Sequence, residues 1–272
     1  MSQADTSVTH PGQYIQVNGL NMYYEEYGNG MPLILLHGGT STSRTWQPFL
    51  STFVPHFWVI TPDSRAHGRT NNPAGIFSYQ LMADDVAAFI QALNLTKPLI
   101  FGYSDGDQIT MDSGIPYPNL TGPLLIGAAW YKFSQTYLNS LKAAGFESPD
   151  IVNIERIQRE APEWVDELKK DHTRNDDPDY WQTLLKQIST MWWTPLDYTE
   201  EDFQKISVST LILLGDRDGS IELQQAVEMY HLIKNAELLI LPNATHFSAL
   251  NELSMRLVLD FMLRHTAQTE EM

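Results

Sequence analysis

The chain has no cysteine, few basic residues and no long apolar run. Without cysteine it cannot form disulfides, a thiolate nucleophile or a zinc–thiolate site. Lysine and arginine total 17 against 33 aspartates and glutamates, so the formal net charge is −16. This acidity argues against nucleic acid or an anionic membrane surface as a partner, because both need a positive surface. Apolar runs such as 33–36 and 211–214 are far too short to cross a bilayer.

The 272 residues suffice for one domain, or for one domain with an insertion. The first eleven residues are polar and lack the basic start and apolar stretch of a secretion signal. We therefore expect a cytoplasmic protein with a disordered tail at residues 1–12. No surface marks an oligomer, so both a monomer and a homodimer remain open.

Short apolar runs alternate with helical periodicity along most of the chain. Residues 14–17 and 22–27 flank Asn18-Gly19, a signal for a β-hairpin. Continuous apolar runs bounded by turn residues predict strands buried on both faces at 32–36, 57–60, 98–101, 124–126, 211–214 and 237–241. Apolar residues at helical spacing predict helices at 79–93, 221–233 and 250–263. This alternation predicts an α/β fold with a mostly parallel sheet behind an antiparallel hairpin.

Residues 131–205 break this alternation, because they contain helix-like segments and no strand-like run. We predict that they form a helical lid, inserted after the sixth strand, over the carboxyl edge of the sheet. The core then comprises residues 13–130 and 206–272. Most aromatic residues of the lid are expected to hold its helices together, and Trp130, Trp192 and Trp193 are candidates for contact with a substrate.

The segment Gly102-Tyr103-Ser104-Asp105-Gly106 follows an apolar run and precedes a helix-like segment. Gly-x-Ser-x-Gly in that setting is typical of a nucleophile elbow, a strained strand-to-helix turn that exposes a serine hydroxyl. The flanking glycines fit because a Cβ would clash in so crowded a turn. The motif predicts Ser104 as a nucleophile.

A serine nucleophile needs a base and a carboxylate that orients the base. Asp216 and Asp218 follow the run 211–214, and His246 follows the run 237–241. Loops at the carboxyl ends of parallel strands converge on one crevice, so these residues can meet Ser104. We favour Asp218 over Asp216, which directly follows a glycine and is better placed to cap the turn.

An oxyanion intermediate needs two backbone donors. The first is expected to be the amide of Asp105, directly after the nucleophile. The second is expected from the loop His37-Gly38-Gly39, where Gly39 is the predicted donor and Gly38 lies beside the substrate.

Together these segments resemble the α/β-hydrolase superfamily from Tyr14 to about His265. The stretch from Asp63 to Thr70 matches a structural turn of that family, so the resemblance implies that His37 and His67 hold turns. It further implies a mostly parallel eight-stranded sheet, a Ser-His-Asp triad, and no cofactor or metal. The elbow Gly-Tyr-Ser-Asp-Gly also resembles the biphenyl hydrolase-like branch, where acidic residues help to recognise the ammonium group of amino-acid esters.

Asp107 departs from the family pattern, which has a small residue at this position. One interpretation is a favourable carboxylate in the first turn of a helix. The other is a functional charge close to Ser104 that raises the pKa of His246 or attracts a cationic substrate, and Tyr103 is a further candidate for substrate contact.

The leading hypothesis is a serine hydrolase that cleaves a small carboxylic ester or lactone through an acyl-enzyme. Amino-acid ester hydrolysis, cofactor-free haloperoxidase chemistry and carbon–carbon bond hydrolysis use the same triad and remain alternatives. A further alternative is a ligand-binding protein that no longer turns over a substrate.

Overall fold

The computed structural model describes residues 12–174, 176–196 and 198–266. Its strands are β1 (Gln13–Val17), β2 (Leu20–Tyr27), β3 (Met31–Leu36), β4 (Phe57–Pro62), β5 (Leu99–Tyr103), β6 (Leu124–Gly127), β7 (Phe146–Ser148), β8 (Ile151–Val152), β9 (Thr210–Gly215) and β10 (Ala236–Leu241). Its helices are the 3₁₀ helix η1 (Ser43–Phe49) and the α-helices α1 (Leu50–Phe53), α2 (Tyr79–Ala92), α3 (Asp105–Gly114), α4 (Gln135–Ala143), α5 (Ile154–Glu160), α6 (Pro162–His172), α7 (Tyr180–Trp192), α8 (Glu200–Lys205), α9 (Leu223–Leu232) and α10 (Glu252–Thr266).

Eight strands form one sheet in the order β1-β2-β4-β3-β5-β6-β9-β10. The six strands β4, β3, β5, β6, β9 and β10 pair in parallel. Strands β1 and β2 form an antiparallel hairpin, and β2 joins the sheet antiparallel to β4. The predicted α/β fold, with its hairpin and its mostly parallel eight-stranded sheet, is confirmed. The interior strands β5, β6 and β9 are buried at every residue, as continuous apolar runs require.

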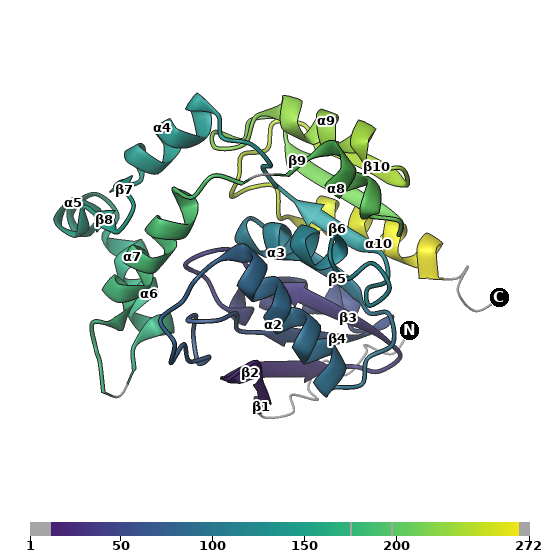
Figure 1. Ribbon diagram of the computed structural model, residues 1–272, viewed down its shortest axis with the longest axis horizontal. Helices are drawn as coiled ribbons and strands as arrows, with labels where there is room; N and C mark the ends of the chain where they lie inside the picture. The colour runs from purple at the N-terminus through teal and green to yellow at the C-terminus, as the bar shows by residue number, and fades with distance from the viewer. Residues whose placement is uncertain (1–11, 175, 197, 267–272) are drawn as a thin grey trace.

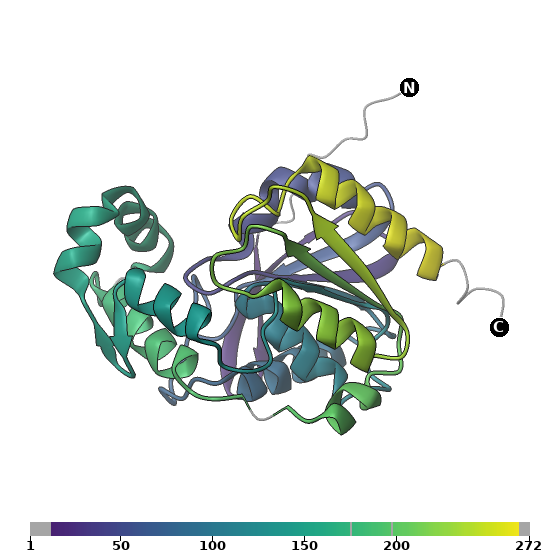
Figure 2. The ribbon, with the colours of Figure 1, turned by 90° about the horizontal axis from the view of Figure 1, so that it is seen from above.

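Helices cover both faces of this sheet, so the core has three layers (Figure 2). Helix α10 lies with α1 on one face, and α2, α3 and α9 cover the other. The sheet therefore presents its carboxyl edge to one side of the molecule. None of the helices in the described ranges is both long and apolar enough to cross a membrane.

The elements from α4 to α7, residues 135–192, lie between β6 and β9 in the chain and to one side of the sheet (Figure 1). We call this segment the insert.

Two expectations for residues 131–205 are wrong in detail. The segment contains a short antiparallel pair, β7–β8, whose two- and three-residue strands leave too little alternation to detect. Helix α8 packs against α9 of the core and away from the insert. The predicted disordered tail lies, except for Gly12, outside the described residues.

The elbow between β5 and α3 allows very close backbone contact. A Cβ on Gly102 would lie 1.9 Å from the carbonyl oxygen of Gly106, and a Cβ on Gly106 would lie 2.2 Å from that of Leu36 in β3. Helix α3 therefore rests directly on the backbone of the sheet, and both glycines are required for steric reasons.

We expect Gly106→Ala to destabilise the fold, because the new methyl group meets backbone that cannot move aside. The free energy of unfolding should fall by about 1–3 kcal/mol or more. Gly219→Ala is the matched control, since a Cβ there meets nothing within 4 Å. Urea denaturation of both variants measures the difference; equal stabilities would contradict the close contact at the elbow.

Candidate active site

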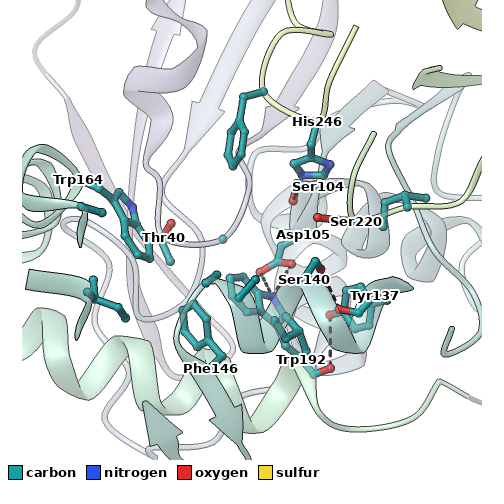
Figure 3. Close-up of a pocket in the computed structure, with 18 of the residues that line it drawn as sticks. Thr40, Ser104, Asp105, Tyr137, Ser140, Phe146, Trp164, Trp192, Ser220 and His246 are labelled. Atoms are coloured by element: carbon teal, nitrogen blue, oxygen red, sulfur yellow. Dashed lines mark hydrogen bonds between the residues drawn. The ribbon is translucent and has the colours of Figure 1, made fainter. Parts of the chain in front are cut away.

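Ser104 occupies a strained turn between β5 and α3. Its backbone has φ 56° and ψ −123°, a conformation that L-residues rarely adopt. Its amide donates to the carbonyl of Gly127 in the neighbouring strand β6, at 2.8 Å, which fixes the turn on the sheet. The side chain projects from the carboxyl edge of the sheet toward His246 (Figure 3).

A chain of two hydrogen bonds links Ser104, His246 and Asp218. His246 Nε2 lies 3.0 Å from Ser104 Oγ, and His246 Nδ1 lies 2.7 Å from Asp218 Oδ2. The second bond assigns the Nδ1–H tautomer, which leaves Nε2 free to accept the serine proton. The three side chains come from the loops after β5, β9 and β10, which end at the same edge of the sheet.

Asp218 is held in place by its own loop. Its Oδ1 accepts the amides of Ser220 at 2.8 Å and Ile221 at 2.9 Å, and its side chain is fully buried. Asp216, the other acid considered from the sequence, is 30% exposed and lies 3.9 Å from the guanidinium of Arg217. The geometry therefore places Asp218, and not Asp216, against His246.

Tyr103, the last residue of β5, links that strand to the loop that carries His246. Its hydroxyl donates to the backbone carbonyl of His246 at 2.6 Å. Its side chain is thus buried beneath the site, and burial raises its pKa above the ordinary value. Tyr103 is not among the residues that line the pocket, contrary to its selection as a candidate for substrate contact.

The loop after β3 makes a tight turn beside Ser104. The Ser41 amide donates to the carbonyl of Gly38 at 3.3 Å, and Thr40 has a φ of 62°. A Cβ on Gly38 would lie 3.1 Å from the Cβ of Ser104, and one on Gly39 would lie 2.2 Å from the carboxylate of Asp105. We call residues 38–41 the oxyanion turn, after the role that the sequence predicts for Gly39. The turn packs Gly38 against Ser104 and Gly39 against Asp105.

A cavity of about 590 Å³ opens from Ser104 and His246 into the insert. Its wall includes the aromatic side chains of Trp130, Tyr137, Phe146, Trp164, Trp192 and Phe247. Figure 3 labels four of them, Tyr137, Phe146, Trp164 and Trp192. Two of the six, Trp130 and Trp192, are among the residues selected from the sequence.

Trp193, the third tryptophan selected from the sequence, is not among the lining residues, because its indole turns away to donate to the carbonyl of Phe146. Tyr137, Phe146 and Trp164 were not selected. Each is one aromatic residue in an insert rich in them, and the sequence carries no signal that separates pocket residues from packing residues.

Asp105 contributes a carboxyl group to the pocket directly beside the nucleophile. It accepts hydrogen bonds from the hydroxyl of Tyr79 at 2.7 Å and from the indole of Trp192 at 2.8 and 2.9 Å. Burial raises its pKa to about 6, against the opposing effect of these donors. Above pH 6 the site therefore carries a negative charge next to Ser104.

Asp107 lies on the first turn of α3 but does not reach the pocket. It is completely buried, and neither carboxyl oxygen has a hydrogen-bond partner among the described residues. Burial, with the nearby Asp105 and Asp218, raises its pKa well above the ordinary value. Both interpretations from the sequence need an ionised carboxylate, and the burial favours the neutral acid.

Two further histidines hold turns, as the sequence predicts. His37 donates from Nδ1 to the carbonyl of Gly38 at 2.8 Å and accepts the amide of Ser64 at Nε2, at 2.9 Å. His67 donates from Nδ1 to the carbonyl of Arg65 at 2.9 Å. Neither lines the cavity at Ser104.

Comparisons with known proteins agree with this architecture. The model of a family described as the alpha/beta hydrolase family matches residues 33–257. A 2-hydroxy-6-oxo-2,4-heptadienoate hydrolase of Pseudomonas putida is 25% identical over 266 residues, covering 92% of this chain and 96% of the relative.

Two solved structures share the fold. A meta-cleavage product hydrolase from Pseudomonas fluorescens IP01 superimposes with a TM-score of 0.78 at 20% identity, covering 93% of this chain and 98% of that one. The enol-lactonase from Burkholderia xenovorans LB400 superimposes with a TM-score of 0.69 at 18% identity, covering 92% and 99%.

We expect Asp107→Ala to stabilise the protein by about 1–3 kcal/mol, because it removes a buried carboxyl group that lacks a partner. Asp107→Asn is the control that keeps the shape and the unpartnered polar atoms but cannot ionise.

Neither variant has a titratable group at this position, so the gain in unfolding free energy over the wild type should rise with pH in the same way for both, and Asp107→Ala should add a gain that does not depend on pH. The pKa of Asp107 is higher in the folded state than in the unfolded state, so the unfolded wild type releases this proton first as the pH rises from about 4. The gain in unfolding free energy from Asp107→Asn should therefore be small at pH 4.5 and larger at pH 8. Urea denaturation at both values tests this, and a gain that is independent of pH would show an unshifted pKa.

Proposed function

The chain belongs to the alpha/beta hydrolase family, and on that premise we propose that it is a serine hydrolase of small, uncharged carboxylic esters or lactones. The observation that carries the proposal is the chain of hydrogen bonds from Ser104 through His246 to Asp218 at the floor of a 590 Å³ pocket. Nucleophile, base and orienting acid lie within hydrogen-bond distance of one another, as acyl transfer requires.

In the proposed mechanism, Ser104 Oγ attacks the carbonyl carbon while His246 Nε2 takes its proton. Asp218 keeps the imidazole in the required tautomer and stabilises its protonated form. The amides of Gly39 and Asp105 stabilise the oxyanion. His246 then returns the proton to the departing alcohol, which leaves an acyl group on Ser104. Water, deprotonated by the same histidine, attacks this ester. The protonated His246 then returns the proton to Ser104 Oγ as the acid leaves, which restores the free enzyme.

The charges of the pocket support an uncharged substrate. Among the described lining residues, Arg156 is the only lysine or arginine. Its guanidinium already donates to Glu160 at 3.1 Å and to the carbonyls of Lys142 and Ala143. Asp105, Glu160 and Glu167 give the lining an excess of negative charge. A substrate carboxylate would therefore lose its water without gaining a free cation as partner.

This distinguishes the proposal from carbon–carbon bond hydrolysis of the kind named for the Pseudomonas putida relative, whose substrate is a dienoate. A Ser-His-Asp triad serves both ester hydrolysis and carbon–carbon bond hydrolysis. Which of the two reactions occurs therefore depends on which substrate the pocket recognises. An anionic substrate would meet the carboxylate of Asp105 beside Ser104.

A second candidate, hydrolysis of amino-acid esters, is favoured by that same carboxylate. Asp105 lines the pocket next to the nucleophile, and its Oδ2 accepts only the longer of the two indole contacts, at 2.9 Å. A substrate ammonium could therefore bind at Oδ2. The measurements below separate the two candidates.

We expect a fluorophosphonate probe to label the protein on Ser104. Ser104→Ala should abolish labelling and lower the kcat for p-nitrophenyl butyrate by at least about 10³-fold, because no other group can form the acyl-enzyme. Ser140→Ala is the control, since this serine lines the same pocket but donates to the carbonyl of Tyr137. A folded wild type that neither reacts with the probe nor hydrolyses esters would instead be a ligand-binding protein.

We further expect discrimination by substrate charge. At pH 8 the kcat/KM for p-nitrophenyl butyrate should exceed that for the equally compact p-nitrophenyl hemisuccinate by about tenfold or more, because the hemisuccinate brings a carboxylate next to Asp105. The ratio should shrink as the pH falls through about 6, where Asp105 takes up a proton. Both substrates use the same free enzyme, so titration of the base cancels in this ratio.

Asp105→Asn provides the matched variant, because it keeps the backbone amide and the side-chain shape. It should reduce the ratio at pH 8 and remove its pH dependence. If the wild type hydrolyses p-nitrophenyl 2-aminobutyrate faster than p-nitrophenyl butyrate and Asp105→Asn does not, the second candidate is favoured. A preference for hemisuccinate in the wild type would contradict the proposed charge selection.

A further inference from the structure

We propose that His172, at the end of α6 in the insert, is a positioning residue that holds the oxyanion turn in its catalytic shape. The proposal rests on the function proposed above, because it assigns His172 a role in the same reaction. His172 lies outside the pocket lining and touches no atom of the Ser104–His246–Asp218 chain.

The imidazole of His172 is fixed by one hydrogen bond on each nitrogen. Its Nε2–H donates to the carbonyl of Thr40 at 3.0 Å, and its Nδ1 accepts the amide of Gly68 at 3.0 Å. The ring is completely buried. These bonds assign one neutral tautomer and leave the ring no freedom to turn, so the position of the Thr40 carbonyl is determined by the insert.

The oxyanion turn needs such support because its backbone is strained. Thr40 is β-branched, yet it adopts a φ of 62°, in the left-handed region that such residues avoid. The hydrogen bond that closes the turn, from Ser41 to Gly38, is long at 3.3 Å. A hydrogen bond to the carbonyl of Thr40 keeps this strained residue from relaxing. Gly39, the proposed oxyanion donor, directly precedes Thr40, so its amide is held as well.

The other side of the turn is also in contact with the insert. A Cβ on Gly39 would lie 2.9 Å from the ring of Trp192 and 2.2 Å from Asp105, which accepts the indole of the same tryptophan. Two side chains of the insert therefore contact the Gly39–Thr40 segment. Trp192 limits Gly39 by packing, whereas His172 provides a directional hydrogen bond to Thr40.

A competing explanation is that His172 only docks the insert on the core. The structure offers a matched control for this, because the hydroxyl of Tyr180 in α7 donates to the carbonyl of Ala66 at 3.0 Å. This bond also joins the insert to the core, but it does not touch the oxyanion turn. Tyr180→Phe thus removes a docking contact and leaves the bond from His172 to Thr40 in place.

Two substitutions separate the two bonds of His172. Glutamine places its amide nitrogen near the position of Nε2, so His172→Gln retains a donor for Thr40. Asparagine places its side-chain oxygen near the position of Nδ1, so His172→Asn retains an acceptor for Gly68 but cannot reach Thr40. If the turn depends on the Thr40 bond, glutamine preserves activity and asparagine does not.

The experiment measures steady-state hydrolysis of p-nitrophenyl butyrate by the full-length wild type and the three variants, with active sites counted by a saturating fluorophosphonate probe. We expect His172→Asn to lower kcat about 10–100-fold, less than the 10²–10³-fold typical for the loss of an oxyanion donor, with KM changed by less than about threefold. His172→Gln and Tyr180→Phe should stay within about threefold of the wild type in kcat.

The inhibition constant of a trifluoromethyl ketone provides a second measurement, which would not change if His172 only docked the insert on the core. The hemiketal of this ketone with Ser104 places an oxyanion in the turn, so its inhibition constant should rise in His172→Asn in parallel with the loss of kcat/KM. The inhibition constant of a ground-state analogue, the corresponding alcohol, should not change. If His172→Asn does not fold by circular dichroism, His172→Leu replaces it, since leucine removes both bonds and fills the space.

Equal losses of kcat in His172→Asn and Tyr180→Phe, or wild-type kcat in His172→Asn, would overturn the assignment. Both outcomes are distinguishable from failure of the proposed function, in which the folded wild type itself neither reacts with the fluorophosphonate probe nor hydrolyses p-nitrophenyl butyrate.

Discussion

The backbone contact between α3 and the sheet is the constraint on which the site depends. Gly102 and Gly106 let the helix approach so closely that any side chain at either position would meet backbone atoms. That approach forces Ser104 into its strained conformation and places the helix N-terminus, with the amide of Asp105, directly after the serine. The strain is maintained because the sheet, and not the turn itself, determines the geometry.

The three carboxyl groups around Ser104 have different surroundings, and the surroundings decide what each can do. Asp218 accepts two backbone amides and faces His246, so both of its carboxylate oxygens have hydrogen-bond partners. Asp105 receives donors from Tyr79 and Trp192 and titrates near pH 6, so it determines the charge that a substrate meets. Asp107 receives none, and its burial favours the neutral acid. Under the proposed function, Asp218 orients the base and Asp105 selects the substrate, whereas Asp107 is expected to cost stability.

The strands and the elbow could be predicted, because each is encoded locally. The meeting of Ser104, Asp218 and His246 could be predicted because each follows a strand that ends at the same edge of the sheet. An apolar run bounded by turn residues becomes a buried strand wherever it lies, and Gly-x-Ser-x-Gly fixes its own turn. The internal arrangement of the insert could not be predicted in the same way. The two-residue strand β8 has no periodicity, and whether Trp192 or Trp193 faces the pocket depends on how α7 is rotated on the core. That rotation is determined by contacts distant in sequence.

His172 is the clearest case of a residue that the sequence cannot identify. A single histidine near the end of an amphipathic helix is ordinary, and its partner Thr40 lies 132 residues away. The contact matters only because Thr40 has a left-handed backbone conformation, which itself follows from the close approach of the oxyanion turn to Ser104. The insert therefore does more than form a pocket wall: through His172 and Trp192 it contacts Thr40 and Gly39, in the segment that we propose to stabilise the oxyanion. Substrate selection and transition-state stabilisation are then linked, since the element that shapes the pocket also holds the turn.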